Sequence, residues 1–401
     1  MNINPKTSLV VPRDVVCLSH LRWGFVYQRP QHLLSRFARR SRVFFVEEPV
    51  PTDGVPRMER QICPESGVNV MVPQMPQGLS LATQQTIQKL LLNNLLMEFD
   101  ISDYLLWYYT PMALSFSSHL KPQVTVFDCM DELSAFKDAP QEMKDREAEL
   151  MRRANVVFTG GQSLYEAKVG RHDCLHAFPS SIDYAHFAQA RTIVEEPADQ
   201  ASIPHPRIGF AGVIDERMNL ELLDGMARLR PEMQFIMLGP VVKIDPATLP
   251  RRSNIHYLGG KTYKELPAYL AGWDAAMLPF AHNESTRYIS PTKTPEYLAA
   301  GKPVVSTSIT DVVRPYGTHG LVRIADTAEE FVSAIDLGLA ADARDADWAA
   351  RRDLFLGGTS WDITFHNMCE VIEDRLISRA TEPVTLSAVS RKPAQTMALG
   401  D

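Results

Sequence analysis

The sequence predicts an α/β protein of two domains, each a doubly wound parallel sheet with helices on both faces. Three observations support this fold class. Short runs of β-branched and aromatic residues alternate with helix-like stretches along the chain. The runs are apolar without interruption, as expected for strands that are covered on both faces. The chain has 401 residues, a length that corresponds to about two domains.

The strands are expected in two sets of six. In the first half of the chain they begin at Val15, Arg42, Val68, Tyr104, Val124 and Val156. In the second half they begin at Arg207, Gln234, Asn254, Ala275, Pro303 and Leu321. A helix-like stretch follows each run, which is the pattern of parallel α/β architecture. Each set therefore predicts a separate parallel sheet.

The boundary between the domains is expected at a stretch that is rich in proline and acidic residues and has neither a strand nor a helix period. After the last strand, a run from Trp361 has apolar residues close to a helical stripe. The predicted organisation is a first domain over 1–190, a linker over 191–206, a second domain over 207–360, a helix over 361–380 and a tail over 381–401.

Composition and charge exclude several classes of protein. With 41 Lys and Arg against 48 Asp and Glu, the net charge is −7, which gives no support for a nucleic-acid partner. The N-terminus lacks the apolar run of a signal peptide, and no apolar run of about 18 residues is present. We therefore expect a cytoplasmic protein with the composition of an ordinary enzyme.

Two groups of residues are interpreted as structural. The five cysteines lie far apart and predict buried thiols in a reducing compartment, without a metal site; they are Cys17, Cys63, Cys129, Cys174 and Cys369. A run of arginines favours the solvated face of a helix, with contact to an anionic membrane surface as the alternative; it comprises Arg29, Arg36, Arg39, Arg40 and Arg42.

Common phosphate-binding and hydrolytic motifs are absent. The sequence has no GxxxxGK[ST] loop, no GxGxxG after the first strand, no GxSxG and no HExxH. Phosphate binding would therefore use helix N-termini and isolated basic residues. Asp345 and Asp347 form a DxD pair, a spacing that can hold a divalent cation. Their alanine-rich and charge-dense surroundings favour a solvated helix face, and we expect no metal.

The densest group of candidate residues is the segment 283–307, where a strand leads into a polar loop and a short helix. The helix is expected to begin near Pro295 and to end at Gly301. Such a unit places backbone N–H groups and the positive end of a helix dipole at the carboxyl edge of a parallel sheet, where ligands bind.

Four side chains of this segment are suited to a nucleotide. Ser290, Thr292 and Lys293 would surround an anion, and Glu296 could accept both ribose hydroxyls. The alternative is that Ser290 only caps the helix and Glu296 only stabilises its N-terminus.

These residues carry a resemblance to a known family. The segment SPTKTPEYLAAGKPVVS resembles the donor-nucleotide segment of retaining glycosyltransferases of the GT-B fold, especially family 4. AFPSSIDYAHF resembles the family's P-N-G-V-D-x-x-x-F segment, and RIGFAGVIDERMNLELL resembles the opening of its nucleotide domain. Among bacterial members, the chain is most similar to the surface-polysaccharide glycosyltransferases with a QRPQH segment, such as those of teichuronic acid synthesis. The resemblance extends from about Val15 to Arg379.

The resemblance implies a fold and an activity. The fold would be GT-B, with two Rossmann-like domains facing a cleft and a C-terminal helix that crosses back to the first domain. The activity would be transfer of a sugar from a nucleotide-diphosphate sugar to a sugar or lipid-linked precursor, with retention and without a metal or another cofactor. A nucleotide-sugar epimerase and a non-catalytic binding subunit are the alternatives on the same fold.

The sequence departs from the family in two places. The E-x7-E motif would pair Glu296 with a glutamate at position 288, which is Tyr288 here. The usual Arg and Lys pair of the nucleotide domain is replaced by Asp215-Glu216-Arg217, so Arg217 is the one obvious cation in this sequence segment. The first departure puts contacts to the transferred sugar in question.

The candidate site residues fall into three groups. For catalysis we select Arg217 and Lys293, which would stabilise the departing diphosphate, and Asp131 and His20, which follow strands of the first domain. For donor binding we select Ser290, Pro291, Thr292, Glu296, Gly212 and Gly24. For acceptor binding we select Trp23, Arg29 and His32. The alternatives are a helix cap for Asp131, a strand-end hydrogen bond for His20 and an interface position for Trp23.

Overall fold

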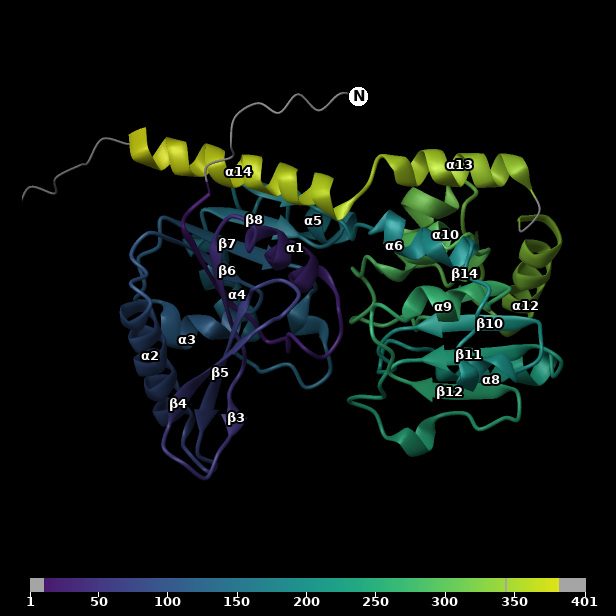
Figure 1. Cartoon of the computed structure of the whole chain (residues 1–401), viewed down its shortest axis with the longest axis horizontal. Coiled ribbons are helices and arrows are strands. Elements are labelled where there is room, and N and C mark those ends of the chain that lie inside the picture. The colour runs from purple at the N-terminus through teal and green to yellow at the C-terminus, as the bar shows by residue number, and fades with distance from the viewer. Residues whose placement is uncertain (1–10, 343–344, 382–401) are drawn as a thin grey trace, which may run out of the picture.

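Two sheets, one in each half of the chain, organise the fold in the computed structural model, which describes residues 11–342 and 345–381. Figure 1 shows the two α/β domains side by side, with α14 (Trp361–Thr381) extended along one side of the first domain. The predicted fold class is confirmed. The expected tail lies outside the described residues, except for Thr381 at the end of α14.

The first sheet has nine strands in the order β3-β5-β2-β1-β6-β7-β8-β9, with β4 paired to β5. The strands are β1 (Asp14–Leu18), β2 (Arg42–Val46), β3 (Val50–Pro51), β4 (Arg57–Ile62), β5 (Asn69–Met75), β6 (Tyr104–Tyr108), β7 (Val124–Cys129), β8 (Val156–Thr159) and β9 (Leu175–Ala177). All six strands expected here are present.

The prediction of six strands was wrong for this sheet, because β3, β4 and β9 were missed. β4 is polar and largely exposed, so its residues lack the apolar signal used to identify strands. It pairs antiparallel with β5, from Arg57 opposite Gln74 to Ile62 opposite Asn69, whereas the other pairs of this sheet are parallel. β3 and β9 have only two and three residues.

The second sheet has the six expected strands, all parallel, in the order β12-β11-β10-β13-β14-β15. They are β10 (Arg207–Ala211), β11 (Gln234–Leu238), β12 (Ile255–Gly259), β13 (Ala275–Leu278), β14 (Val304–Ser306) and β15 (Arg323–Ile324). The strand order reverses between β10 and β13. Ligands of open α/β sheets bind at such a point, beyond the carboxyl ends of the strands.

Helices cover both faces of each sheet. Those of the first domain are α1 (Arg29–Phe37), α2 (Leu81–Glu98), α3 (Leu114–Ser117), α4 (Met143–Arg153) and α5 (Gln162–Lys168). Those that follow are α6 (Tyr184–Ala188), α7 (Ala198–Ala201), α8 (Leu220–Leu229), α9 (Leu266–Ala271), α10 (Lys293–Ala299), α11 (Thr310–Val312), α12 (Ala328–Leu337), α13 (Ala346–Gly357) and α14. Each sheet accordingly has a hydrophobic core on either face.

The terminal helix α14 crosses back to the first domain, as the predicted fold class requires. It contacts α1, β7 and β8. Met368, Cys369 and Ile372 are fully buried in the same core as Val15 and Trp107. The apolar stripe of this helix therefore joins the end of the chain to the first sheet. Among the described residues, no helix is long and apolar enough to cross a membrane.

The segment expected to be an irregular linker contains the short helix α7. Its Gln200 is fully buried, and the side chain accepts a hydrogen bond from Trp273 Nε1 at 3.0 Å. Glu196 forms an ion pair with Arg207 at 2.7 Å. These contacts attach the segment to the second domain. One helical turn is too short to produce a detectable period in the sequence.

The arginines of the first domain do not share one solvated face. Arg29 is buried, whereas Arg36 and Arg42 form ion pairs with Asp362 and Asp14. This prediction was wrong, because the run continues beyond α1 into β2. The described cysteines are all free thiols, and all except the half-buried Cys63 are buried.

Candidate functional site

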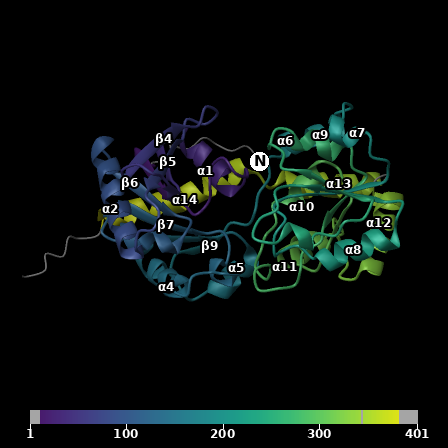
Figure 2. The same ribbon diagram turned by 90° about the horizontal axis from the view of Figure 1, so that it is seen from below.

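The carboxyl edges of the two sheets face each other, and loops from both domains are in contact there. The backbone N–H of Lys137, after β7, donates to Glu216 Oε1 at 2.9 Å. The backbone N–H of Ser180, after β9, donates to Ser290 Oγ at 3.3 Å. Figure 2 shows α5 of the first domain beside α11 of the second, at the same junction. The surface between the two domains therefore lies at the carboxyl ends of the strands of both sheets.

The helix of the predicted donor segment, α10, begins at Lys293 rather than near Pro295. A proline is tolerated there because the first turn of a helix leaves its N–H groups without intrahelical partners. Gly301, with φ of +80°, follows the end of the helix. The earlier start places both Lys293 and Glu296 in the first turn.

Lys293 and Glu296 form an ion pair at this end of α10. Lys293 Nζ lies 2.8 Å from Glu296 Oε2, and both side chains are mostly buried. Burial raises the pKa of Glu296, and the Lys293 ammonium opposes that effect. The Glu296 carboxylate therefore accepts a hydrogen bond from Lys293 in the first turn of α10, and its role in binding ribose hydroxyls stays a prediction.

The residues before α10 join the domains. Thr292 is the N-cap residue, but its side chain makes no capping hydrogen bond, and Pro291 precedes it. Ser290 accepts from the Ser180 N–H, and its carbonyl oxygen accepts from Ser180 Oγ. Ser290 therefore contacts the first domain instead of capping α10.

Arg217 lies in the loop after β10. Its guanidinium binds Asp215 with two hydrogen bonds, Nε to Oδ1 at 2.9 Å and Nη2 to Oδ2 at 2.7 Å. The same group lies over the ring of Phe136 from the first domain, 5.6 Å from the ring centroid. Gly212 precedes this loop, and its carbonyl oxygen would be 1.8 Å from a Cβ at Gly239. Close backbone packing thus fixes the loop that carries Arg217.

Asp131 of the first domain lies near the Arg217 guanidinium, whereas His20 lies near Lys243, in the loop after β11. Burial raises the pKa of Asp131, which lies close enough to Arg217 for that guanidinium to lower it in part. Burial and the nearby Lys243 lower the pKa of His20 to about 4, so the imidazole is neutral at pH 7. Its Nδ1 is buried and makes no hydrogen bond within the described residues. Both groups retain the capacity to contact a ligand.

The candidate acceptor residues have structural partners instead. Arg29 is 3% exposed, binds Asp128 at 2.8–3.1 Å and donates to the Phe178 carbonyl at 2.7 Å. His32 is buried and stacks on Trp361 at 4.6 Å between centroids. The Trp23 ring packs edge-on against Phe45 at 5.1 Å. We therefore do not assign Arg29 and His32 to acceptor binding, because their side chains are buried. Trp23 is half-buried, and its role in acceptor binding stays a prediction.

Gly24, chosen as a point of close backbone approach, is exposed, and a Cβ at this position would have no other atom within 4 Å. Nothing in the described fold therefore requires a glycine there. A role in approaching the donor stays a prediction.

Three further residues lie at the junction and are not among the predicted site residues. Phe136 and Lys243 lie beside Arg217, with Lys243 Nζ 5.6 Å from the Phe136 centroid. Tyr263 stacks between Tyr27 at 4.4 Å and His186 at 4.2 Å. The only available signal was position, since each residue follows a strand of one of the sheets.

Tyr288, which stands where the family has its first glutamate, is half-buried and packs against a core cluster of the first domain. Arg287 lies over its ring, 5.2 Å from the centroid. The position contributes an apolar contact between the domains, which an ionised glutamate could not make without a desolvation cost.

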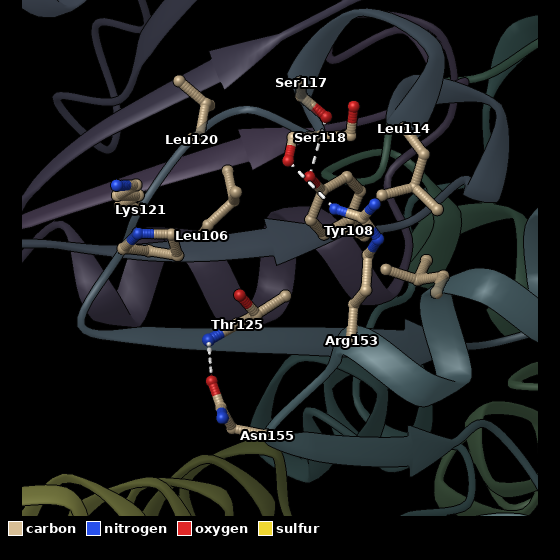
Figure 3. A pocket seen from close by; sticks show the side chains of 12 residues that line it. Leu106, Tyr108, Leu114, Ser117, Ser118, Leu120, Lys121, Thr125, Arg153 and Asn155 are labelled. Atoms are coloured by element: carbon tan, nitrogen blue, oxygen red, sulfur yellow. Dashed lines mark hydrogen bonds between the residues drawn. The ribbon is translucent and has the colours of Figure 1, made fainter. Parts of the chain in front are cut away.

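Two cavities lie elsewhere on the surface. One of about 360 Å³ lies in the first domain among β6, α3 and α4 and includes Tyr108, Lys121 and Arg153 (Figure 3). Another of about 290 Å³ lies beyond β13 and β14 and includes His282, Arg287 and Ser308. Neither contains a predicted site residue.

In the described parts of the chain, no three His, Cys, Asp or Glu residues are arranged to hold a metal ion. The carboxylate of Asp345 accepts from the Asp347 N–H at 2.8 Å and thereby caps α13. The DxD pair is part of a helix start, as the favoured interpretation expected.

Comparisons with known proteins agree with this architecture. Residues 205–340 match the family described as "Glycosyl transferases group 1". The "Putative teichuronic acid biosynthesis glycosyltransferase TuaH" of Bacillus subtilis (strain 168) is 25% identical over 275 residues, which are 62% of this chain and 67% of that protein.

Two solved structures are similar over most of the chain. Sucrose-phosphate synthase from Thermosynechococcus elongatus has a TM-score of 0.69 and 14% identity, covering 91% of this chain and 100% of that one. Anabaena HepE in complex with UDP and glucose has a TM-score of 0.62 and 14% identity, covering 89% and 98%. At these identities the structures establish the fold.

Proposed function

We propose that the chain, a glycosyltransferase of the GT-B type, transfers a sugar from a nucleoside-diphosphate sugar to a precursor of a cell-envelope polysaccharide or glycolipid. We further propose that transfer retains the anomeric configuration and requires no metal. The name of the bacterial relative supports the acceptor class, and the donor class follows from the helix N-terminus and cations at the interdomain surface.

The observation that carries this proposal is the first turn of α10. Lys293 and Glu296 lie in this turn, within the segment that connects β13 to β14 in the second sheet. A carboxylate for ribose hydroxyls and a cation for phosphate are thus one helical turn apart. The departing diphosphate would be stabilised by Lys293, by Arg217 and by the helix dipole.

The first domain would act on the other side of the transferred sugar. Neutral His20 can accept a hydrogen bond from a sugar hydroxyl, and Asp131 can orient an acceptor near the Arg217 guanidinium. In the retaining reaction we propose, the acceptor hydroxyl attacks from the face that the diphosphate leaves. The protein would orient both substrates and exclude water, and would not form a covalent intermediate.

The donor is tested with a thermal-shift panel of UDP, GDP, ADP, CDP and dTDP, each with and without Mg²⁺. A ligand at about 100 times its Kd adds roughly 2.7 kcal/mol of stability, provided that it binds the native state alone. Glu296→Ala should abolish the shift, whereas Glu232→Ala, at an exposed glutamate of the same domain, should keep it. If none of the diphosphates stabilises the wild type, the proposed donor class is wrong.

Product analysis tests the reaction. NMR of the product should show a new glycosidic bond with the donor's anomeric configuration. An epimerised nucleotide sugar would indicate the alternative epimerase, and nucleotide binding without turnover would indicate a binding subunit. Because a lipid-linked acceptor would place the protein at a membrane surface, we also propose peripheral membrane contact, which sedimentation with anionic vesicles tests.

A further inference from the structure

Two cations of the donor region are already paired with carboxylates. Arg217 binds Asp215 through two hydrogen bonds, and Lys293 binds Glu296 at 2.8 Å. Each pair is formally neutral. A diphosphate bound at this surface therefore accepts hydrogen bonds from Arg217 and Lys293. The net positive charge that attracts it is small, because each cation already has a carboxylate partner.

Lys243 supplies a cation without such a partner. It follows β11, it is exposed, and its backbone has φ of +61°. Within the described residues, no carboxylate lies within ion-pair distance of its Nζ. Its ammonium is nevertheless close to the first domain, because it lowers the pKa of His20, although burial is the larger cause.

Phe136 lies close to both Lys243 and Arg217. The Lys243 Nζ and the Arg217 guanidinium carbon each lie 5.6 Å from the centroid of its ring. Cations at this distance from an aromatic face are attracted to it. One half-buried ring of the first domain thus contacts two cations of the second domain, which come from the loops after β10 and β11.

We propose that Lys243 binds a phosphate group of a substrate, together with Arg217, near Phe136. The inference rests on the proposed function and deepens it. It assigns a further phosphate-binding cation, besides Arg217 and Lys293, to the loop after β11. The phosphate could belong to the nucleotide-sugar donor or to a phosphorylated acceptor, and the chemistry of recognition is the same in both cases.

The nearby acidic groups do not satisfy Lys243 in advance. Burial is the largest influence on Glu48 and raises its pKa, although Arg22 and Lys243 oppose that effect. Arg22 itself binds Glu47 at 3.0 Å and also donates to the Glu48 carbonyl. Within the described residues, Lys243 forms no ion pair with Glu47 or Glu48, so its ammonium is available to a ligand.

The experiment measures two affinities by calorimetry. The first is the Kd of the nucleoside diphosphate found in the thermal-shift panel. The second is the Kd of inorganic pyrophosphate, as a probe for an acceptor phosphate, with the nucleoside diphosphate already saturating. Both are measured for wild type, Lys243→Ala and Lys243→Arg. Lys264→Ala is the control, because Lys264 is an exposed lysine of the same domain that faces Glu65 of the first domain at 3.7 Å.

Lys243→Ala should raise one of the two Kd values by roughly tenfold or more, as expected for the loss of a charged hydrogen bond. Lys243→Arg should recover most of the affinity, and Lys264→Ala should change neither value. An effect on the first Kd assigns the phosphate to the donor, and an effect on the second assigns it to the acceptor.

If Lys243→Ala is folded by its melting temperature and both Kd values equal those of wild type, the inference is wrong. It is also wrong if pyrophosphate does not bind and the nucleotide affinity is unchanged. A wild-type protein that binds no nucleoside diphosphate would instead overturn the proposed function, so the two failures are distinguishable.

Discussion

The backbone N–H of Ser163 in the first domain donates a hydrogen bond to both carboxylate oxygens of Asp311 in the second domain, at 3.0 Å to Oδ1 and 3.3 Å to Oδ2. Ser163 lies in the first turn of α5, so the cap of this helix comes from the opposite domain. Gly161 allows the approach, because a Cβ at that position would be 2.3 Å from Asp311 Oδ2. The relative position of the domains and the start of α5 therefore depend on one another.

Asp311→Ala should consequently loosen the junction. Loss of a helix cap costs about 1–2 kcal/mol of unfolding free energy. Hydrogen exchange at the start of α5 should accelerate more than exchange in β1 or β10. Glu166→Gln is the matched control, because the Arg314–Glu166 ion pair joins the same two domains but is exposed to solvent, which screens it. Equal exchange in both variants would contradict the interdomain cap.

Asp215→Asn should reduce turnover through Arg217. The neutral amide cannot hold the guanidinium with two charged hydrogen bonds, so Arg217 becomes mobile. We expect kcat to fall roughly tenfold or more and the melting temperature to change little. Asp224→Asn removes a similar pair with Arg252 on the surface and should leave kcat unchanged. A fall in kcat for both variants would indicate a general structural effect.

The buried Arg29–Asp128 pair is expected to matter for stability. Arg29→Ala leaves the fully buried Asp128 carboxylate without its partner, which should cost about 3–5 kcal/mol of unfolding free energy. The double variant Arg29→Met/Asp128→Leu should recover much of this loss. Chemical denaturation measures both. An unchanged stability of Arg29→Ala together with a raised acceptor KM would restore the acceptor role expected from the sequence.

The fold was predictable to the extent that its strands are apolar. β10, β11, β13 and β14 of the second sheet and six strands of the first have runs of buried residues that identify them in the sequence, whereas β12 and β15 are only partly buried. β4 has no such run, since its residues are largely exposed and its strand pairing is with β5. Pairing between distant segments depends on the tertiary structure, which the local pattern of apolar residues in the sequence does not show.

The site was predictable only in its local part. Lys293 and Glu296 are three residues apart on one helix, so their proximity follows from the sequence once α10 is recognised. Phe136, Arg217 and Lys243 come together from three loops and two domains, which no spacing in the sequence encodes. The sequence predicted Arg29 to be an exposed cation. Its partner Asp128 lies 99 residues away, so the ion pair could not be found from local spacing.

The stability of the protein should depend on pH through His20. The pKa of His20 is lowered from 6.5 to about 4 in the folded protein, mainly by burial. The folded state thus binds fewer protons than the unfolded state between these pH values. The free energy of unfolding is therefore highest above pH 6.5, where the imidazole is neutral in both states. It falls by about 1–3 kcal/mol as the pH falls towards 4. His20→Gln should remove this part of the difference between pH 7 and pH 4.5 in denaturant titrations, while His319→Gln, at an exposed histidine of the second domain, should preserve it.

Tyr288→Glu, which restores the family's usual residue, should impair the protein. Tyr288 packs against buried residues of the first domain, so a carboxylate there is desolvated or forces the domains apart. We expect a loss of about 1–3 kcal/mol of unfolding free energy and no gain in kcat. Tyr288→Phe keeps the apolar contact and should resemble wild type in both measurements. A more active Tyr288→Glu would show that position 288 still faces the transferred sugar, and that the contact with the first domain yields when the donor binds.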